Sequence, residues 1–288
     1  MKIRNNKFFI TLLLIIVLLA WYFTKFPQKS LDLFDGKEEG NLYYSSSLDV
    51  SIDSVSNDIN FYVKDGIDQV EYSLNGSTRE KLVVNESGTK LKLSVKVPSF
   101  NWFGFGSGSL EITVPTSFVF DKLEVSSVSG DIICDELKAE ELLSFKCLSG
   151  NIFFNNLIAK QIKLATTSGN IDGSTALCSI LNIKSLSGEI DLAKVQAPNE
   201  DVLELTAKSI SGNCDILDIG SFKSCNISTS SGNIDCYFSV PVGLIAQSMS
   251  GNIYINGKIQ NVDVNNINTD ENYLVKASTA SGNISINY

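Results

Sequence analysis

A Ser-Gly signature, followed by an acidic or amide residue and then by Ile or Cys, recurs from Ser129 to the C-terminus. Successive signature glycines are separated by 20, 19, 19, 24, 20, 19 and 31 residues. A period near 19–20 residues with occasional insertions is typical of stacked copies of one supersecondary unit. The chain is therefore expected to fold as a repeat aligned on these glycines: Gly130, Gly150, Gly169, Gly188, Gly212, Gly232, Gly251 and Gly282.

The residues around each glycine alternate with a period of two, which is the pattern of β-strands. Positions seven and five residues before the glycine are apolar or Cys, and the position three before holds only Ser, Thr or Cys. A second inward-facing position follows two residues after the glycine. We expect a narrow corner between two strands, where Gly adopts a conformation forbidden to other residues, Asn or Asp tolerates left-handed geometry and Ser bonds the local backbone.

The segment before the first signature alternates in the same way, as in "LDVSIDSVSNDINFYV" and "TKLKLSVKV". No stretch of comparable length has a convincing helical period, so the region beyond the N-terminus is predicted to be mostly β. The two longest intervals contain the polar insertions Ala193–Val202 and Lys258–Asn272. Such insertions suit excursions from the surface of a repeat.

The segment "SLEITVPTSFVFDKLEVSSVSGDIICDELKAEELLSFKCLSGNI" resembles the bacterial putative-adhesin family, a domain family of unknown function with repeated SGN or SGD motifs. The resemblance extends from about residue 45 to the C-terminus. It implies an all-β fold, a single-stranded parallel β-helix (β-solenoid) with rungs of about 19–20 residues. It supplies no catalytic residues to transfer, and the six cysteines depart from the family pattern.

The N-terminus predicts a membrane anchor. A basic segment precedes the apolar run Phe8–Phe23, so the N-terminus is expected in the cytoplasm and the β-region outside it. A cleaved signal peptide is the alternative, but bulky residues follow Ala20 where a cleavage site would need small ones. The predicted organisation is a cytoplasmic stub with transmembrane helix at 1–26, a linker at 27–41, a β-rich cap or first rungs at 42–120, and the SGN-repeat β-helix at 121–288.

Composition excludes several functions. The chain has no histidine, which removes Ser-His and Cys-His nucleophile pairs and the commonest general base. The net charge is −9, and because Lys2, Arg4 and Lys7 lie in the basic N-terminal segment, the rest of the chain carries −12. A chain of this charge repels polyanions, so no nucleic-acid partner is expected. We also expect no catalytic residues, no cofactor and no metal centre.

The six cysteines allow disulfides or a metal site outside the cytoplasm. No Cys-x-x-Cys pair occurs, and the spacings match no zinc site. Several of the cysteines occupy columns otherwise filled by Ile or Leu. Buried free thiols that pack as small hydrophobic groups are the favoured interpretation, for Cys134, Cys147, Cys178, Cys214, Cys225 and Cys236.

Two further features suggest surfaces. Asp172, Asp191, Asp215 and Asp235 lie three residues after consecutive signature glycines, so parallel stacking would place them about 4.8 Å apart. They form either a solvated acidic face or a weak strip for cations or cationic ligands. The loop "PSFNWFGFGSGS", with Trp102, Phe103 and Phe105, either closes the first rung as a lid or contacts a membrane or partner.

These observations predict a membrane-anchored, extracytoplasmic β-repeat protein that acts as a non-enzymatic binding, adhesion or envelope-sensing module. The expected partners are the membrane, through the N-terminal helix, and an envelope protein or glycan. The alternatives are a polysaccharide-acting β-helix enzyme and a purely structural spacer. The last signature, which runs to Tyr288, is expected to form the final rung. The C-terminal end is therefore predicted to be closed by the insertion Lys258–Asn272 or to make end-to-end contact with a second copy or a partner.

Overall fold

The computed structural model describes residues 37–42, 48–76, 81–96, 108–198, 203–260, 264–267 and 273–288. The chain divides into two units, Met1–Asp35 and Gly36–Tyr288, and all described residues belong to the second. The predicted membrane segment Phe8–Phe23 and the side chains of Trp102, Phe103 and Phe105 lie outside them. Among the described residues, no helix is long and apolar enough to cross a membrane.

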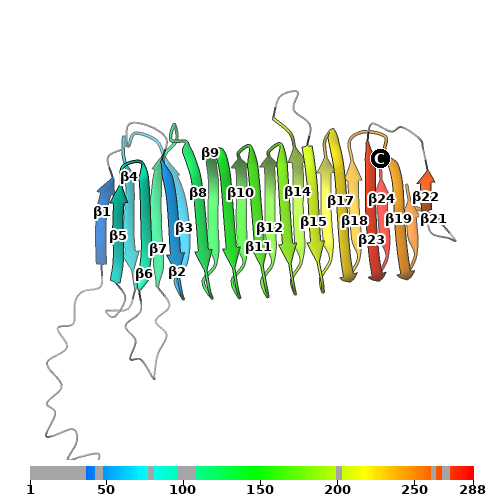
Figure 1. Cartoon of the computed structure of the whole chain (residues 1–288), viewed down its shortest axis with the longest axis horizontal. Coiled ribbons are helices and arrows are strands. Elements are labelled where there is room, and N and C mark those ends of the chain that lie inside the picture. The colour runs from blue at the N-terminus through cyan, green and yellow to red at the C-terminus, as the bar shows by residue number, and fades with distance from the viewer. Residues whose placement is uncertain are drawn as a thin grey trace, which may run out of the picture. The chain divides into compact units, whose positions relative to one another are not determined.

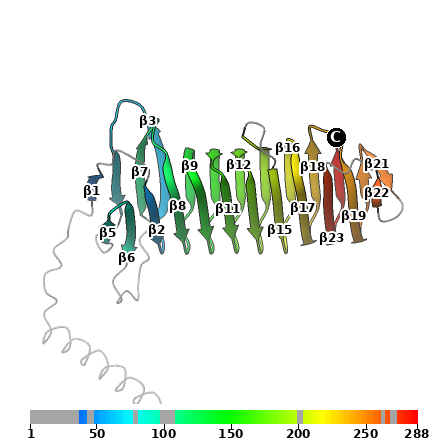
Figure 2. The same ribbon diagram turned by 45° about the horizontal axis from the view of Figure 1, so that its top comes forward.

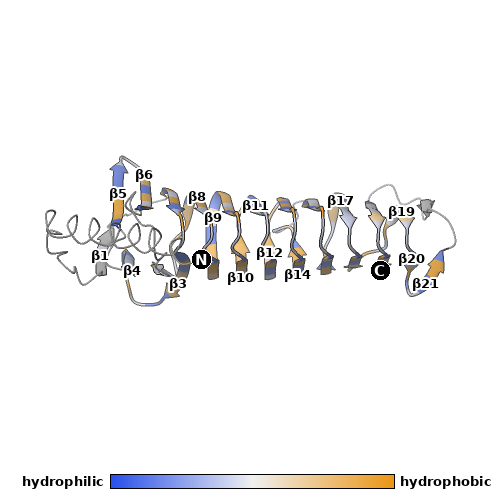
Figure 3. Ribbon diagram, turned by 90° about the horizontal axis from the view of Figure 1, so that it is seen from below, coloured by the Kyte–Doolittle hydropathy of each residue, from blue (hydrophilic) through white to orange (hydrophobic). Residues whose placement is uncertain are grey.

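All regular secondary structure in the described residues is β, arranged as two facing layers (Figures 1 and 3). The 16-residue strand β9 (Ile132–Cys147) contributes its first half to sheet A and its second half to sheet B. Sheet A otherwise contains β1 (Lys37–Leu42), β3 (Asp58–Lys64), β4 (Val70–Asn75), β7 (Ser109–Pro115), β10 (Ile152–Ile158), β12 (Ile171–Leu177), β14 (Ile190–Gln196), β16 (Cys214–Ile219), β18 (Ile234–Phe238), β20 (Ile253–Ile255), β21 (Lys258–Gln260) and β24 (Ile284–Asn287). Sheet B otherwise contains β2 (Asp49–Ser54), β5 (Lys81–Ser87), β6 (Lys90–Lys96), β8 (Phe120–Ser127), β11 (Gln161–Thr166), β13 (Ile180–Ser185), β15 (Leu203–Ser209), β17 (Phe222–Ser231), β19 (Gly243–Ser250), β22 (Val264–Ile267) and β23 (Leu274–Ser281).

Each rung gives one strand to each sheet, and neighbouring rungs pair in parallel. Ile152, for example, lies opposite Ile132 on one side and Ile171 on the other. The inward positions of the two sheets enclose a continuous apolar core, in which Phe61 and Phe145 stack with ring centroids 6.4 Å apart. The predicted all-β solenoid, with corners at the signatures, is therefore confirmed.

The order of rungs in space differs from their order in the sequence at both ends. Strand β23 lies between β17 and β19, and β24 lies between β18 and β20 (Figure 1). At the other end, β2 lies between β6 and β8, and β3 lies between β7 and β9. The expectation that the last signature forms the last rung is therefore wrong, because the rung that contains Gly251 lies outside the rung that contains Gly282.

Antiparallel strands border the stack at both ends. The insertion Lys258–Asn272 provides β21, which pairs with β20, and β22, which pairs with β19 (Figure 2). At the N-terminal end, β4 pairs with β7 and β1 pairs with β4, while β5 pairs with β6. The insertion thus covers the outer strands of the final rung, as one of the two alternatives predicted.

Candidate functional site

The signature glycines stack directly on one another along one edge of the solenoid, which we call the signature edge. A Cβ atom added at Gly169 would overlap the carbonyl oxygen of Gly150, and a Cβ at Gly150 would overlap that of Gly130. Among the signature glycines, only Gly251 and Gly282 have positive φ angles, of 156° and 154°. The conformational reason that the sequence suggested is therefore wrong for the other six, which are glycine because the rungs approach too closely for a side chain.

The residue after each signature glycine is Asn or Asp, except for Glu189, and these Asx residues form a ladder between rungs. The backbone N–H of Asn170 donates to Oδ1 of Asn151 at 2.9 Å, and that of Asn233 donates to Oδ1 of Asn213 at the same distance. None of these residues has positive φ, so left-handed geometry is not what selects them. They are selected because a short side-chain oxygen can accept from the next rung.

One further copy of the signature was not recognised in the sequence. In "SVSND", Asn57 occupies the glycine position, and a Cβ at Gly130 would overlap its carbonyl oxygen. Ser54 plays the part of the small residue three positions earlier, because its Oγ accepts from the N–H of Asn57 at 3.1 Å. The replacement of Gly by Asn concealed this copy from an alignment on glycine.

An exposed aliphatic column follows the signature edge. It consists of the residues two positions before Asn57 and before the first five signature glycines. From Val128 onward, the N–H of each donates to the preceding rung and so fixes the register, as from Ile210 to Ser185. Its large apolar members are 41–53% exposed. We name this column the aliphatic ridge: Val55, Val128, Leu148, Leu186 and Ile210, with Thr167 between Leu148 and Leu186. The sequence carried the signal in "SVSG", "CLSG", "SLSG" and "SISG", but simple alternation assigned these outward positions no role.

The four aspartates predicted as a strip do lie side by side on the outer face of sheet A. Asp172 pairs with Asp191, Asp191 with Asp215, and Asp215 with Asp235. Partial burial, followed by repulsion from Asp235 and Asp191, raises the pKa of Asp215 to about 6. Within the described ranges, no group of three or more potential metal-binding side chains has a geometry suited to an ion.

All six cysteines are buried and free, as the favoured interpretation predicted. Burial raises the pKa of the Cys147, Cys178 and Cys214 thiols to about 12, and it also raises the pKa of Cys134, Cys225 and Cys236. Because the thiolate is the reactive form, these side chains are chemically inert at neutral pH.

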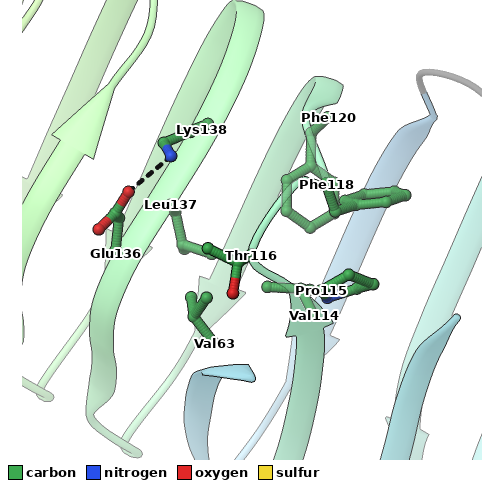
Figure 4. A pocket seen from close by; sticks show the side chains of 9 residues that line it. All are labelled: Val63, Val114, Pro115, Thr116, Phe118, Phe120, Glu136, Leu137 and Lys138. Carbon is green, nitrogen blue, oxygen red and sulfur yellow. Dashed lines mark ion pairs between the residues drawn. The ribbon is translucent and has the colours of Figure 1, made fainter. Parts of the chain in front are cut away.

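A small cavity lies between Phe118, Phe120 and Leu137, close to the ion pair between Lys138 and Glu136 (Figure 4). Its volume of about 10 Å³ is that of a single water molecule. It is too small for a ligand. The aliphatic ridge is therefore the stronger candidate for contact with a partner.

These features define a class: a β-solenoid with parallel rungs, a narrow glycine edge and antiparallel strands at both ends. The chain belongs to the Toastrack DUF4097 family, whose model matches residues 47–287. This confirms the resemblance to the putative-adhesin family.

Comparison with solved structures finds a putative adhesin from Bacteroides fragilis, with 16% identity and a TM-score of 0.50, over 88% of this chain and 97% of that chain. A putative adhesin from Parabacteroides distasonis has 10% identity and a TM-score of 0.41, over 88% and 98%. Comparison with curated proteins finds no match. At this level of identity, the Bacteroides structure supports the fold alone.

Proposed function

We propose that this protein is anchored in the membrane by residues 8–23 and holds its solenoid outside the cytoplasm as a non-enzymatic binding or adhesion module. The observation that carries the proposal is the aliphatic ridge, a row of exposed large apolar side chains that Thr167 alone interrupts. Contiguous exposed apolar surface on a soluble domain is typical of a contact site for another molecule.

Two features of the sequence support the location and the absence of catalysis. The basic segment before Phe8–Phe23 favours a cytoplasmic N-terminus. The lack of histidine disfavours the usual hydrolytic mechanisms, and the Thr166 hydroxyl is bonded within the corner, where it donates to the Gly150 carbonyl at 3.2 Å. The description of the Bacteroides structure as a putative adhesin agrees with a binding role.

Cysteine labelling in intact cells tests both parts of the proposal. Ile210→Cys places a thiol on the ridge, and Leu217→Cys places a matched control on sheet A, since both side chains are 53% exposed. The native thiols are buried and will give little background. A membrane-impermeant maleimide should label the Leu217→Cys variant in intact cells, and it should label the Ile210→Cys variant more slowly in cells than in purified protein.

The location of the solenoid and the role of the ridge can be contradicted independently. Labelling of the Leu217→Cys variant only after lysis would contradict the extracytoplasmic location. Equal labelling of the Ile210→Cys variant in cells and in purified protein would show an uncovered ridge and contradict its role as the contact surface.

A further inference from the structure

The outer face of sheet B contains a hollow of about 410 Å³ near its N-terminal end. Strand β5 pairs with β6 and stands out from the layer that contains β8 and β11 (Figure 3). The strands therefore form a concave surface, with β5 as one wall and β6, β2 and β8 as the floor. This volume lies within the range typical of small-molecule sites.

The register of the strands places alternating charges across the floor. Asp49 lies directly between Lys90 on β6 and Lys122 on β8, and Ser87 on β5 lies opposite Lys90. In the next row, Ser51 lies beside Lys92. Lysines, hydroxyls and two carboxylates, Asp49 and Glu124, thus line one hollow, although they come from four strands.

Lys92 and Asp49 differ in whether their polar atoms have partners within the protein. The Lys92 ammonium is held by Asp53 at 2.7 Å, and Ser126 donates to the same carboxylate at 2.7 Å. By contrast, Oδ1 of Asp49 is buried and accepts no hydrogen bond from any described residue. A buried carboxylate oxygen that accepts no hydrogen bond is unfavourable. A ligand that donates a hydrogen bond to Oδ1 of Asp49 would therefore be stabilised in the hollow.

We infer that this hollow binds an acidic saccharide. An anionic group of the sugar lies between the ammonium groups of Lys90 and Lys122, and a ring hydroxyl donates to Oδ1 of Asp49. A simple anion such as sulfate has no hydroxyl with which to satisfy Asp49, and a neutral sugar has no charge to pair with the lysines. The site deepens the proposed binding function, since an envelope glycan reaches it only if the solenoid is extracytoplasmic.

Calorimetric titration of the purified full-length protein in detergent at low salt tests this site. The probes are a galacturonic acid trimer, a neutral galactose trimer and inorganic sulfate. We expect measurable binding of the galacturonic acid trimer alone. Lys90→Gln combined with Lys122→Gln should weaken it at least about tenfold, as expected when charge-assisted hydrogen bonds are lost. Lys163→Gln, on the same face but outside the hollow, should leave it unchanged.

A second variant tests the contact with the ring hydroxyl separately from the contact with the anionic group. Asp49→Ala should weaken binding of the galacturonic acid trimer without creating a preference for the neutral trimer, provided that its melting temperature matches the parent. Equal binding of sulfate and the acidic trimer, or an unchanged affinity in the double lysine variant, would overturn the inference. Because purified protein is used, these outcomes are independent of where the solenoid lies in the cell.

Discussion

The ring of Phe154 fills the space that a Cβ atom at Gly173 would occupy. The two residues are direct partners in β10 and β12, and a Cβ at Gly173 would overlap the Phe154 ring. A large side chain in one rung is thus matched by the absence of one in the next. Because the interior is close-packed, neither position can change size without affecting the other.

This pairing predicts a coupled response to substitution. Gly173→Ala should destabilise the protein by about 1–3 kcal/mol, the usual cost of overpacking a core. Phe154→Leu should remove most of that cost, so the double variant should be more stable than the sum of the single effects predicts. Urea unfolding of the four proteins measures the coupling, and strictly additive free energies would contradict it.

The stacking of the signature glycines predicts that Gly→Ala substitutions differ in their effect on stability. Gly169→Ala would place a Cβ against the Gly150 carbonyl and should cost at least about 1–3 kcal/mol, because the backbone cannot move aside easily. Gly220→Ala is the control, since its Cβ would meet only the flexible side chain of Gln196, at 3.2 Å. If both variants unfold at the same urea concentration, close stacking of rungs is not why glycine occupies the signature.

The raised pKa of Asp215 makes stability depend on pH. Its pKa of about 6 in the folded state exceeds the ordinary value of 3.8, so the folded protein holds this proton more tightly than the unfolded chain does. The parent should therefore lose stability as pH rises through this interval. Asp215→Asn should raise the melting temperature at pH 7 and have little effect below pH 4. A shift of equal size at both pH values would rule out titration as its cause.

The interior position of the C-terminal strand predicts the effect of truncation. Ending the chain after Ser281 removes β24 from between β18 and β20, leaving both without a partner on that side. Because rungs contact chiefly their neighbours, damage should remain local. Hydrogen exchange should accelerate in β18 and β20 while β10 and β12 keep their protection. Uniform acceleration along the chain would instead indicate that the solenoid unfolds as one cooperative unit.

The repeat could be predicted from sequence because alternation and glycine spacing are local signals. The packing of the two sheets was implied by the inward columns, and the buried cysteines followed from their places in those columns. The reason for glycine was not accessible, because Gly169 is constrained by Gly150, a residue in another rung. A local conformational explanation was the only one that the sequence offered.

The strand order and the hollow could not be predicted for a related reason. Nothing in the segment around Gly282 distinguishes a final rung from one placed between β18 and β20, since the inward residues are the same types. The convergence of Lys90, Asp49 and Lys122 depends on β2 lying between β6 and β8. Only the three-dimensional pairing brings these side chains together.

The most direct test of the account is site-specific photocrosslinking in intact cells. A photoreactive p-benzoylphenylalanine at Leu186 should give discrete adducts of higher mass, and these should be lost when Leu148→Ser and Ile210→Ser are added. The same group at Leu217, exposed on the outer face of sheet A, should give none. Adducts at Leu186 alone would agree with the aliphatic ridge as the binding surface. No adduct at Leu186, or equal adducts at both positions, would contradict it.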